Sequence, residues 1–288
     1  MKITEIYQSW GTILETTYDE VMSLDSQYLT DLVLSRNLLV VRNLTTDLTD
    51  EEYFRFGEKF GRVWTTDIYK KPFINTGHDR TLNDQNSLTP VSYFQSHNTM
   101  FGHNYMHYHA DMPHVNEYSF PGRCLYLTKN TMSVSGTTTW LNLELGWMLC
   151  SDSERRQFDN ISVVYHDMYV PGQRLEKRDF LKTNPKTGKL SPSVNCWYYG
   201  KKPNGVETKG WIHHLELDGQ ALNVAETGKI ISDLYALIES KPNTIYSHPW
   251  QEGDCIVYDN WFNVHKRDPV IDDTNHVRLL KRLTFNFY

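Results

Sequence analysis

The sequence lacks the features that membrane-spanning and nucleic-acid-binding proteins require. Its longest aliphatic stretch is the four residues Leu38–Val41, whereas a membrane-spanning helix needs about 20 apolar residues. The first residues become acidic before any apolar run develops, so no export signal is recognised. The formal net charge is −6, with 29 basic and 35 acidic residues and no long block of one sign. We therefore expect a cytoplasmic protein with no nucleic-acid partner and no membrane partner.

Cysteine is scarce and scattered. The four cysteines are Cys124, Cys150, Cys196 and Cys255, and no two of them form a C-x-x-C pair. This spacing argues against a zinc site or a disulfide framework and favours reduced thiols. Internal repeats, low-complexity tracts and a Pro/Gly/Ser-rich linker are also missing, so we expect residues 1–288 to form a single domain. Whether it forms a homo-oligomer is left open.

Aromatic residues make up 13% of the chain and must supply much of the buried area. Helical spacing of apolar residues is found at 28–34 and 224–239 and, less clearly, at 147–158. Thr49 and Glu52 form a capping box for a further helix that ends before Gly61. Residues 65–105 are polar and are expected to form loops. The remaining short apolar runs predict strands at 38–41, 124–128, 137–141, 161–165 and 255–258 and at the C-terminus.

Many short strands with a few peripheral helices predict an α+β fold that is mainly β. The expected architecture is a double-stranded β-helix, or jelly roll, with flanking helices and a lid-like insertion. We place that insertion in the turn-rich stretch after residue 170, which includes Cys196–Tyr199 and the pair His213-His214. A plain packing role for these residues is about as well supported by the sequence.

Three side chains are candidates for binding a metal ion. His109 and Asp111 are two residues apart, so on an extended strand both point to the same side. His265 follows a strand at 255–258 and the turn Asp259-Asn260. Each is weak alone, because a single H-x-D or a single histidine is more often structural. Together, two imidazoles and one carboxylate make the facial triad that binds non-haem Fe(II) and leaves positions open for a cosubstrate and oxygen.

The C-terminal strand carries two arginines on its polar face, Arg278 and Arg282. Four residues along a strand span roughly 13 Å, so the two guanidinium groups should have different roles. The alternative is that both arginines lie on an open, solvent-exposed sheet face.

Several motifs, taken in their order along the chain, resemble the TauD/TfdA (taurine-dioxygenase-like) family of Fe(II)/2-oxoglutarate-dependent oxygenases. Beyond the residues above, the resemblance rests on Leu38–Leu44 followed by Leu48–Glu52, on Gly136–Trp140, which is similar to a G-x-T-x-W segment, on Asn184–Gly188, and on Trp250–Asn260. It extends over most of the chain.

The resemblance implies that His109, Asp111 and His265 bind Fe(II). It implies that Arg278, assisted by the Thr138 hydroxyl, binds the distal carboxylate of the cosubstrate 2-oxoglutarate. Arg282 is then expected to contact the substrate or the inner end of the cosubstrate. The implied reaction consumes O2, oxidises a C–H position of a small anionic molecule by hydroxylation or desaturation, and releases succinate and CO2. Asp111 favours such an oxidation over halogenation, because halogenating relatives lack this carboxylate.

The chain also departs from the family pattern. Tyr108 directly precedes His109, the first predicted metal ligand, and Tyr105 lies four residues before it. The family usually has an asparagine at the position of Tyr105. We expect both tyrosines to contact the substrate, which need not resemble taurine. The histidines His97, His103, His107 and His114 form an unusually dense cluster around His109. They could supply a different set of metal ligands, but the sequence favours roles as partners of the ligands, substrate contacts or surface residues.

Two other readings remain open at this point. One is a cupin-like enzyme that binds a divalent metal through the same triad without using 2-oxoglutarate. The other is a non-catalytic binding module that has kept the fold. Arg278 and Thr138 favour the oxygenase over the first, and the intact triad argues against the second.

Overall fold

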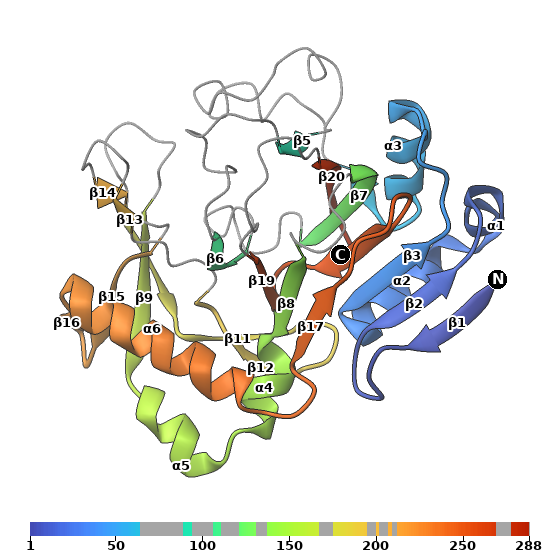
Figure 1. Ribbon diagram of the computed structural model, residues 1–288. Coiled ribbons are helices and arrows are strands. Elements are labelled where there is room, and N and C mark those ends of the chain that lie inside the picture. Colours follow the sequence, from blue (N-terminus) through green and yellow to red (C-terminus); the bar gives the residue numbers. More distant parts are fainter. Residues whose placement is uncertain are drawn as a thin grey trace.

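The computed structural model describes residues 1–63, 89–93, 106–110, 121–130, 137–166, 175–194, 200–201, 207–208, 212–268 and 278–287. In that part of the chain, two antiparallel-rich β-sheets face each other, and helices cover their outer sides (Figure 1). The two sheets share no strand there, so they form an open sandwich of the jelly-roll type rather than a closed barrel. The predicted fold class is confirmed.

The larger sheet has eight strands. Along the sheet the order is β1 (Lys2–Glu5), β2 (Thr12–Glu15), β3 (Leu38–Arg42), β18 (Cys255–Asp259), β7 (Gly122–Asn130), β20 (Arg278–Asn286) and β4 (Arg62–Val63), and β5 (Thr89–Tyr93) also pairs with β20. Only the β2–β3 pair among these is parallel. Strand β5 lies inside the segment 65–105, so the expectation of loops throughout that segment is wrong for residues 89–93.

The smaller sheet has four strands, in the order β17 (Ile245–His248), β8 (Thr138–Asn142), β19 (Asn263–Arg267) and β6 (Met106–His109). The chain crosses from the larger to the smaller sheet in the short turn between β18 and β19. Asn263 holds this turn, because its side-chain amide donates to the carbonyls of Asn37 and Asp259 at 3.0 and 2.9 Å. The Asp259 carboxylate in turn accepts from the backbone N–H of Trp261.

The space between the two sheets is filled by large side chains. The larger sheet contributes Leu38, Val40, Leu125, Ile256 and Tyr258, and the smaller sheet contributes Trp140, with Trp10 completing the cluster and Tyr246 and Trp250 packed against it. Trp140 and Tyr258 are fully buried. Buried aromatic side chains, as the composition predicts, occur in this cluster and in the two clusters on the outer faces of the sheets. The cluster between the sheets is the one that adjoins the site residues.

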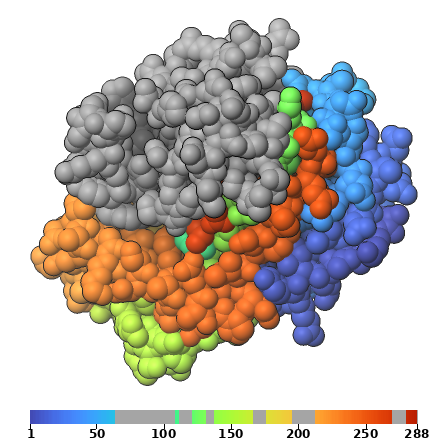
Figure 2. All heavy atoms as spheres, in the orientation of Figure 1, coloured from blue at the N-terminus to red at the C-terminus, as the bar shows by residue number. Residues whose placement is uncertain are grey.

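The outer face of the larger sheet is covered by α1 (Tyr18–Ser23), α2 (Ser26–Arg36) and α3 (Asp50–Glu58). The capping box predicted for Thr49 and Glu52 starts α3, and Tyr53 and Phe56 of that helix are fully buried against the sheet. In the space-filling view these N-terminal residues form one flank of the molecule (Figure 2).

The outer face of the smaller sheet is covered by α4 (Leu143–Leu149) and α6 (Val224–Glu239) and by a second four-stranded sheet. That sheet has the order β10 (Leu175–Asp179), β9 (Ile161–His166), β15 (Ile212–Leu217) and β16 (Gln220–Ala221). Two small hairpins complete the described strands: β11 (Leu181–Thr183) with β12 (Leu190–Pro192), and β13 (Gly200–Lys201) with β14 (Glu207–Thr208). Residues 195–199 of the expected lid lie outside the described residues, and His213 and His214 belong to β15.

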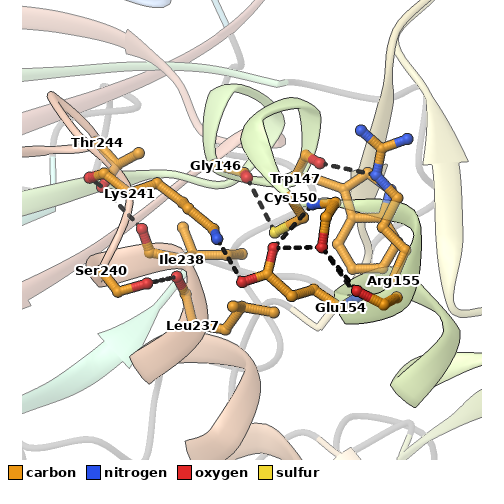
Figure 3. Close-up of polar contacts among 12 residues, drawn as sticks. Gly146, Trp147, Cys150, Glu154, Arg155, Leu237, Ile238, Ser240, Lys241 and Thr244 are labelled. Carbon is orange, nitrogen blue, oxygen red and sulfur yellow. Dashed lines mark hydrogen bonds and ion pairs between the residues drawn. The ribbon is translucent and has the colours of Figure 1, made fainter.

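Helix α5 (Asp152–Arg155) and a short 3-10 helix (Arg156–Phe158) follow α4. Figure 3 shows how this corner is held: Lys241, just after α6, forms an ion pair with Glu154 of α5 at 2.6 Å, and the Cys150 thiol donates to the carbonyl of Gly146. The hydrogen bonds from Lys241 and from Ser151 lower the pKa of Glu154 to about 2. Among the described residues, no helix combines the length and apolar character needed to cross a bilayer.

Candidate active site

His109 and His265 are brought together by the smaller sheet. They are directly opposite residues on the neighbouring antiparallel strands β6 and β19, so their side chains stand on the same face. Their ring centroids are 4.3 Å apart, with 46° between the ring planes. His265 is 8% exposed. The structure thus pairs two of the three predicted metal ligands, which are 156 positions apart in the sequence.

Two aromatic rings pack against His265. Trp140 on β8 is opposite His265, and the ring centroids are 6.3 Å apart. Tyr258 reaches over from the larger sheet, with its ring 5.4 Å from that of His265 and 5.6 Å from that of Trp140. These rings fix the position of the His265 imidazole and exclude water from the side of it that they contact.

The next row along the same face is polar. Thr138 lies two residues before Trp140 on β8, and Arg267 lies two residues after His265 on β19. The two are directly opposite each other in the sheet, and both are buried, at 5% and 8% exposure. The Thr138 hydroxyl accepts a hydrogen bond of 3.0 Å from the indole N–H of Trp250. The predicted cosubstrate residue Thr138 therefore lies on the face that carries the histidines.

Sequence reasoning missed Arg267 as a site residue. The signal was the same spacing that singled out His109 and Asp111: on a strand, residues two apart point to the same side. Applied to His265, this rule places Arg267 beside it.

Arg282 lies on the inner face of the larger sheet. Its partner across the sheet is Leu125, a member of the core between the sheets, and it is 6% exposed. Arg123, on β7 opposite Tyr258, is also buried on this face. The alternative of a solvent-exposed Arg282 is therefore wrong. Its neighbour Lys281 points outward and forms an ion pair with Asp50 at 2.7 Å.

The structure does not bring Tyr108 to this face. Its hydroxyl donates to Glu239 of α6 at 2.8 Å, and its ring lies 5.4 Å from that of Tyr235, on the outer side of the smaller sheet. The reason is strand alternation: Tyr108 precedes His109, so it points the opposite way. The expected substrate contact of Tyr108 is therefore corrected to a hydrogen bond and a ring contact with α6.

Several predicted site residues belong to segments that the structure does not describe. Asp111 and Tyr105 lie outside the described residues, as do His97, His103, His114 and Cys196, and only the backbone is described for His107 and Arg278. In β20, the backbone of Arg278 pairs with Asn130 on one side and Tyr93 on the other. The described residues contain no group of three or more potential metal ligands. The three cysteines that are described, Cys124, Cys150 and Cys255, are free and buried, as expected.

A buried ionic cluster of Arg42, His248 and Asp254 lies next to Thr138, since His248 is opposite Thr138 in the sheet. Asp254 accepts from the Arg42 guanidinium through two bonds of 3.0 Å and from His248 Nε2 at 2.9 Å. His248 Nδ1 contacts the hydroxyl of Tyr246 at 2.8 Å. Burial by itself would raise the pKa of Asp254, but the hydrogen bonds from His248 and Arg42 outweigh it, so this pKa lies below its ordinary value of 3.8. Burial raises the pKa of Tyr246.

The donor set suits a non-haem iron. Imidazoles on adjacent strands are borderline ligands that suit Fe(II), Mn(II) or Co(II), and the carboxylate that the sequence predicts as the third ligand, Asp111, lies outside the described residues. The aromatic rings next to His265 and the buried arginines on both inner faces suit an anionic organic ligand beside the metal.

The sequence profile of the taurine catabolism dioxygenase TauD, TfdA family matches residues 2–284. The chain belongs to this family. A comparison with curated proteins found no significant match.

Solved structures with the same fold cover nearly all of this TauD/TfdA chain. A taurine dioxygenase from Burkholderia xenovorans is 17% identical with a TM-score of 0.67, and the match covers 99% of this chain and 90% of that one. PvcB from Pseudomonas aeruginosa is 17% identical with a TM-score of 0.70, covering 99% and 91%, and it is described as an Fe, alpha-ketoglutarate dependent oxygenase from an isonitrile synthetic pathway. AAD-2 in complex with Mn(II) and N-oxalylglycine is 14% identical with a TM-score of 0.65, covering 99% and 96%.

As a member of this family, the protein is a 2-oxoglutarate-dependent non-haem iron dioxygenase, which uses Fe(II), 2-oxoglutarate and O2. The likeness to the solved structures shows the shared fold.

Proposed function

We propose that this dioxygenase oxidises a C–H position of a small anionic molecule, by hydroxylation or desaturation, with release of succinate and CO2. The observation that carries the proposal is the pairing of His109 and His265 across adjacent strands, with ring centroids 4.3 Å apart. Two histidines in this position, beside buried arginines, suit a metal that binds an anionic keto acid.

In the proposed site, His109, Asp111 and His265 bind Fe(II). The bound iron supplies the oxidising chemistry, using O2 and the electrons released by decarboxylation of 2-oxoglutarate. The chain itself positions the reactants. Trp140 and Tyr258 hold the ring of His265 and keep water from its inner side, since both are fully buried.

Arg278 and Thr138 are proposed to bind the distal carboxylate of 2-oxoglutarate. The support is that Thr138 is buried on the face that carries the histidines and lies two residues from Trp140 on β8. A guanidinium fork and a neutral hydroxyl donor together match the planar carboxylate.

Arg282 is proposed to bind an anionic group of the substrate or the inner end of the cosubstrate. Its position supports this role, because it is buried on the inner face of the larger sheet, next to Leu125 of the core between the sheets. A guanidinium fork matches a carboxylate or sulfonate, which it can bind through two hydrogen bonds.

The test is the visible absorption band that Fe(II) and 2-oxoglutarate give together under anaerobic conditions. The wild-type protein should show this weak band, and His109→Ala, Asp111→Ala and His265→Ala should lose it. Arg278→Ala should weaken 2-oxoglutarate binding far more than metal binding, because it removes a carboxylate contact and leaves the metal ligands intact. His213→Ala, at a histidine of β15 outside the proposed site, is the matched control and should keep the band.

A folded, metal-loaded wild-type protein without the band would contradict the use of 2-oxoglutarate and favour the cupin-like alternative. Equal loss of metal and cosubstrate binding in Arg278→Ala would show that this arginine has another role. A screen of amino acids, sulfonates and other small acids for stimulated succinate formation would then identify the substrate class. Stimulation by neutral compounds alone would contradict an anionic substrate.

A further inference from the structure

Trp250 controls the direction in which the Thr138 hydroxyl can donate. The indole N–H of Trp250 donates to Thr138 Oγ1 at 3.0 Å. An indole N–H has no acceptor capacity, so the threonine oxygen must be the acceptor of this bond. The hydroxyl proton of Thr138 is thereby directed to a different acceptor.

The indole of Trp250 is itself held in place by the buried ionic cluster. Its ring meets the ring of His248 edge-on, with centroids 4.8 Å apart and 89° between the planes. His248 is fully buried and is bonded to Asp254 on one side and to Tyr246 on the other. Asp254 is fixed by the two hydrogen bonds from Arg42. The chain of contacts thus runs from the Arg42 guanidinium to the Thr138 hydroxyl.

The sheet register supports this connection. His248 on β17 is directly opposite Thr138 on β8, so the strands fix the distance between the cluster and the hydroxyl. The remaining freedom is rotation about the Cα–Cβ and C–O bonds of Thr138, and the hydrogen bond from Trp250 restricts both.

We propose that Trp250 is a positioning residue for cosubstrate binding: it orients the Thr138 hydroxyl so that this group donates to the distal carboxylate of 2-oxoglutarate. This inference rests on the proposed role of Thr138. A carboxylate accepts hydrogen bonds and donates none when ionised, so a threonine that is held as a donor binds it better than one that rotates freely.

The test measures binding rather than turnover. Calorimetric titration of 2-oxoglutarate into the Mn(II)-loaded protein gives the affinity of the wild type and of Trp250→Phe. The phenyl ring keeps the edge-on contact with His248 and lacks the N–H. We expect about a fivefold weaker affinity for 2-oxoglutarate, in line with the loss of one oriented hydrogen bond, and unchanged Mn(II) affinity.

A double-mutant cycle separates positioning from packing. Thr138→Val removes the hydroxyl and keeps the shape of the side chain, and it should weaken 2-oxoglutarate binding by itself. In the Thr138→Val background, Trp250→Phe should cause no further loss. Trp10→Phe is the matched control, since Trp10 also donates its indole N–H, but to the carbonyl of Asn243, and its loss should leave 2-oxoglutarate affinity unchanged.

The ligand 2-oxobutanoate, which lacks the distal carboxylate, gives a second control. Its affinity should not change in Trp250→Phe. Should that variant fail to fold, Trp250→Leu takes its place in the same cycle.

The outcomes distinguish this inference from the proposed function. A wild-type protein that does not bind 2-oxoglutarate contradicts the proposed function. If the wild type binds it but Thr138→Val or Trp250→Phe has no effect, the positioning role is wrong. It is also wrong if Trp250→Phe weakens 2-oxoglutarate binding equally in the Thr138→Val background, because the effect would then come from packing.

Discussion

Asp254 accepts hydrogen bonds from residues that the chain brings together from distant positions. Arg42 comes from β3, near the N-terminus, and His248 from the end of β17, and the backbone N–H of Gln251 adds a further bond of 2.9 Å. The Asp254 side chain is 1% exposed and that of Arg42 is 20% exposed. A carboxylate with so little water around it depends on these partners for its charge.

At the residue scale, we predict that Asp254→Asn lowers the free energy of unfolding by about 3 kcal/mol, because it leaves the Arg42 guanidinium without its charged partner. Urea unfolding followed by circular dichroism measures the change. Asp233→Asn is the control: Asp233 pairs with Lys229 on the exposed side of α6 at 2.6 Å, so its loss should cost less than about 0.5 kcal/mol. Equal losses in the two variants would mean that the buried pair contributes no more than a surface pair.

The same substitution tests how the stability of the folded protein depends on pH. Because the pKa of Asp254 lies below its ordinary value of 3.8 in the folded protein, its ionisation stabilises the fold above that value. The stabilisation is lost as the pH falls below 3.8 and through the lower folded-state pKa. The wild type should therefore lose more stability than Asp254→Asn between about pH 5 and about pH 3. A parallel loss in both proteins would assign the acid effect to other groups.

Spacing and chemistry together singled out two residues that the fold brings side by side. His109 and His265 are candidates because imidazoles are metal ligands, and the register of β6 and β19 places them opposite each other. Trp250 could not be assigned a role from the sequence, since its partner Thr138 is 112 positions away. Tyr108 was misassigned because a position next to His109 in the sequence does not mean a position beside it in space: successive residues on a strand point to opposite faces.

At the scale of secondary-structure elements, helices α4 and α6 pack closely at Gly146. An ideal Cβ on Gly146 would lie 2.2 Å from Cγ2 of Ile238, and Ile238 is fully buried. Figure 3 shows both residues in the corner where α4, α5 and the end of α6 meet. The glycine is therefore needed here for close approach of the two helices.

At this scale, we predict that Gly146→Ala destabilises the protein by about 2 kcal/mol, because the new methyl group overpacks the contact with Ile238. Ile238→Ala alone should also destabilise it, by creating a cavity. The double variant should be more stable than the sum of the two losses implies, since the added methyl group occupies part of that cavity. Thermal or urea unfolding of the four proteins measures this coupling, and strict additivity would contradict direct contact.

Helices and strands could be predicted from the sequence only where their apolar residues follow the spacing of one buried face. The helix expected at 224–239 is present with those bounds as α6, and its buried positions include Ile231 and Leu234. Strand β19 was not predicted, because its inner face carries His265 and Arg267 instead of apolar residues. The single helix expected at 147–158 is interrupted at Cys150, where Ser151 and Glu154 form a new capping box for α5.

In the molecule as a whole, the proposed metal would link β6 to β19. We predict that Mn(II) raises the melting temperature of the wild type by about 4 °C or more at a metal concentration of about 100 times Kd, because it binds the folded state alone. His265→Ala should show no such shift, while His213→Ala should keep it. Scanning calorimetry before and after removal of the metal with EDTA measures this. A full shift in His265→Ala would place the metal elsewhere.

The overall architecture was predictable because a mainly β pattern with few amphipathic helices and motifs in the family's order points to one class of fold. The open arrangement of the sheets was not, because it depends on which strand edges pair. Strands β1 and β2 were also missed: β1 is exposed along its whole length, so its sequence contains no buried face to indicate a strand.

The order of strands in the larger sheet has a consequence for synthesis on the ribosome. Strand β18 lies between β3 and β7, and β20 lies between β7 and β4, yet both are made after residue 250. A nascent chain that ends before them leaves the backbone N–H and C=O groups of β7, and those on the β18 side of β3, without a partner strand. Cotranslational folding of this sheet must therefore wait until β18 and β20 have been made, and chaperone capture in that interval would protect the emerging chain from aggregation.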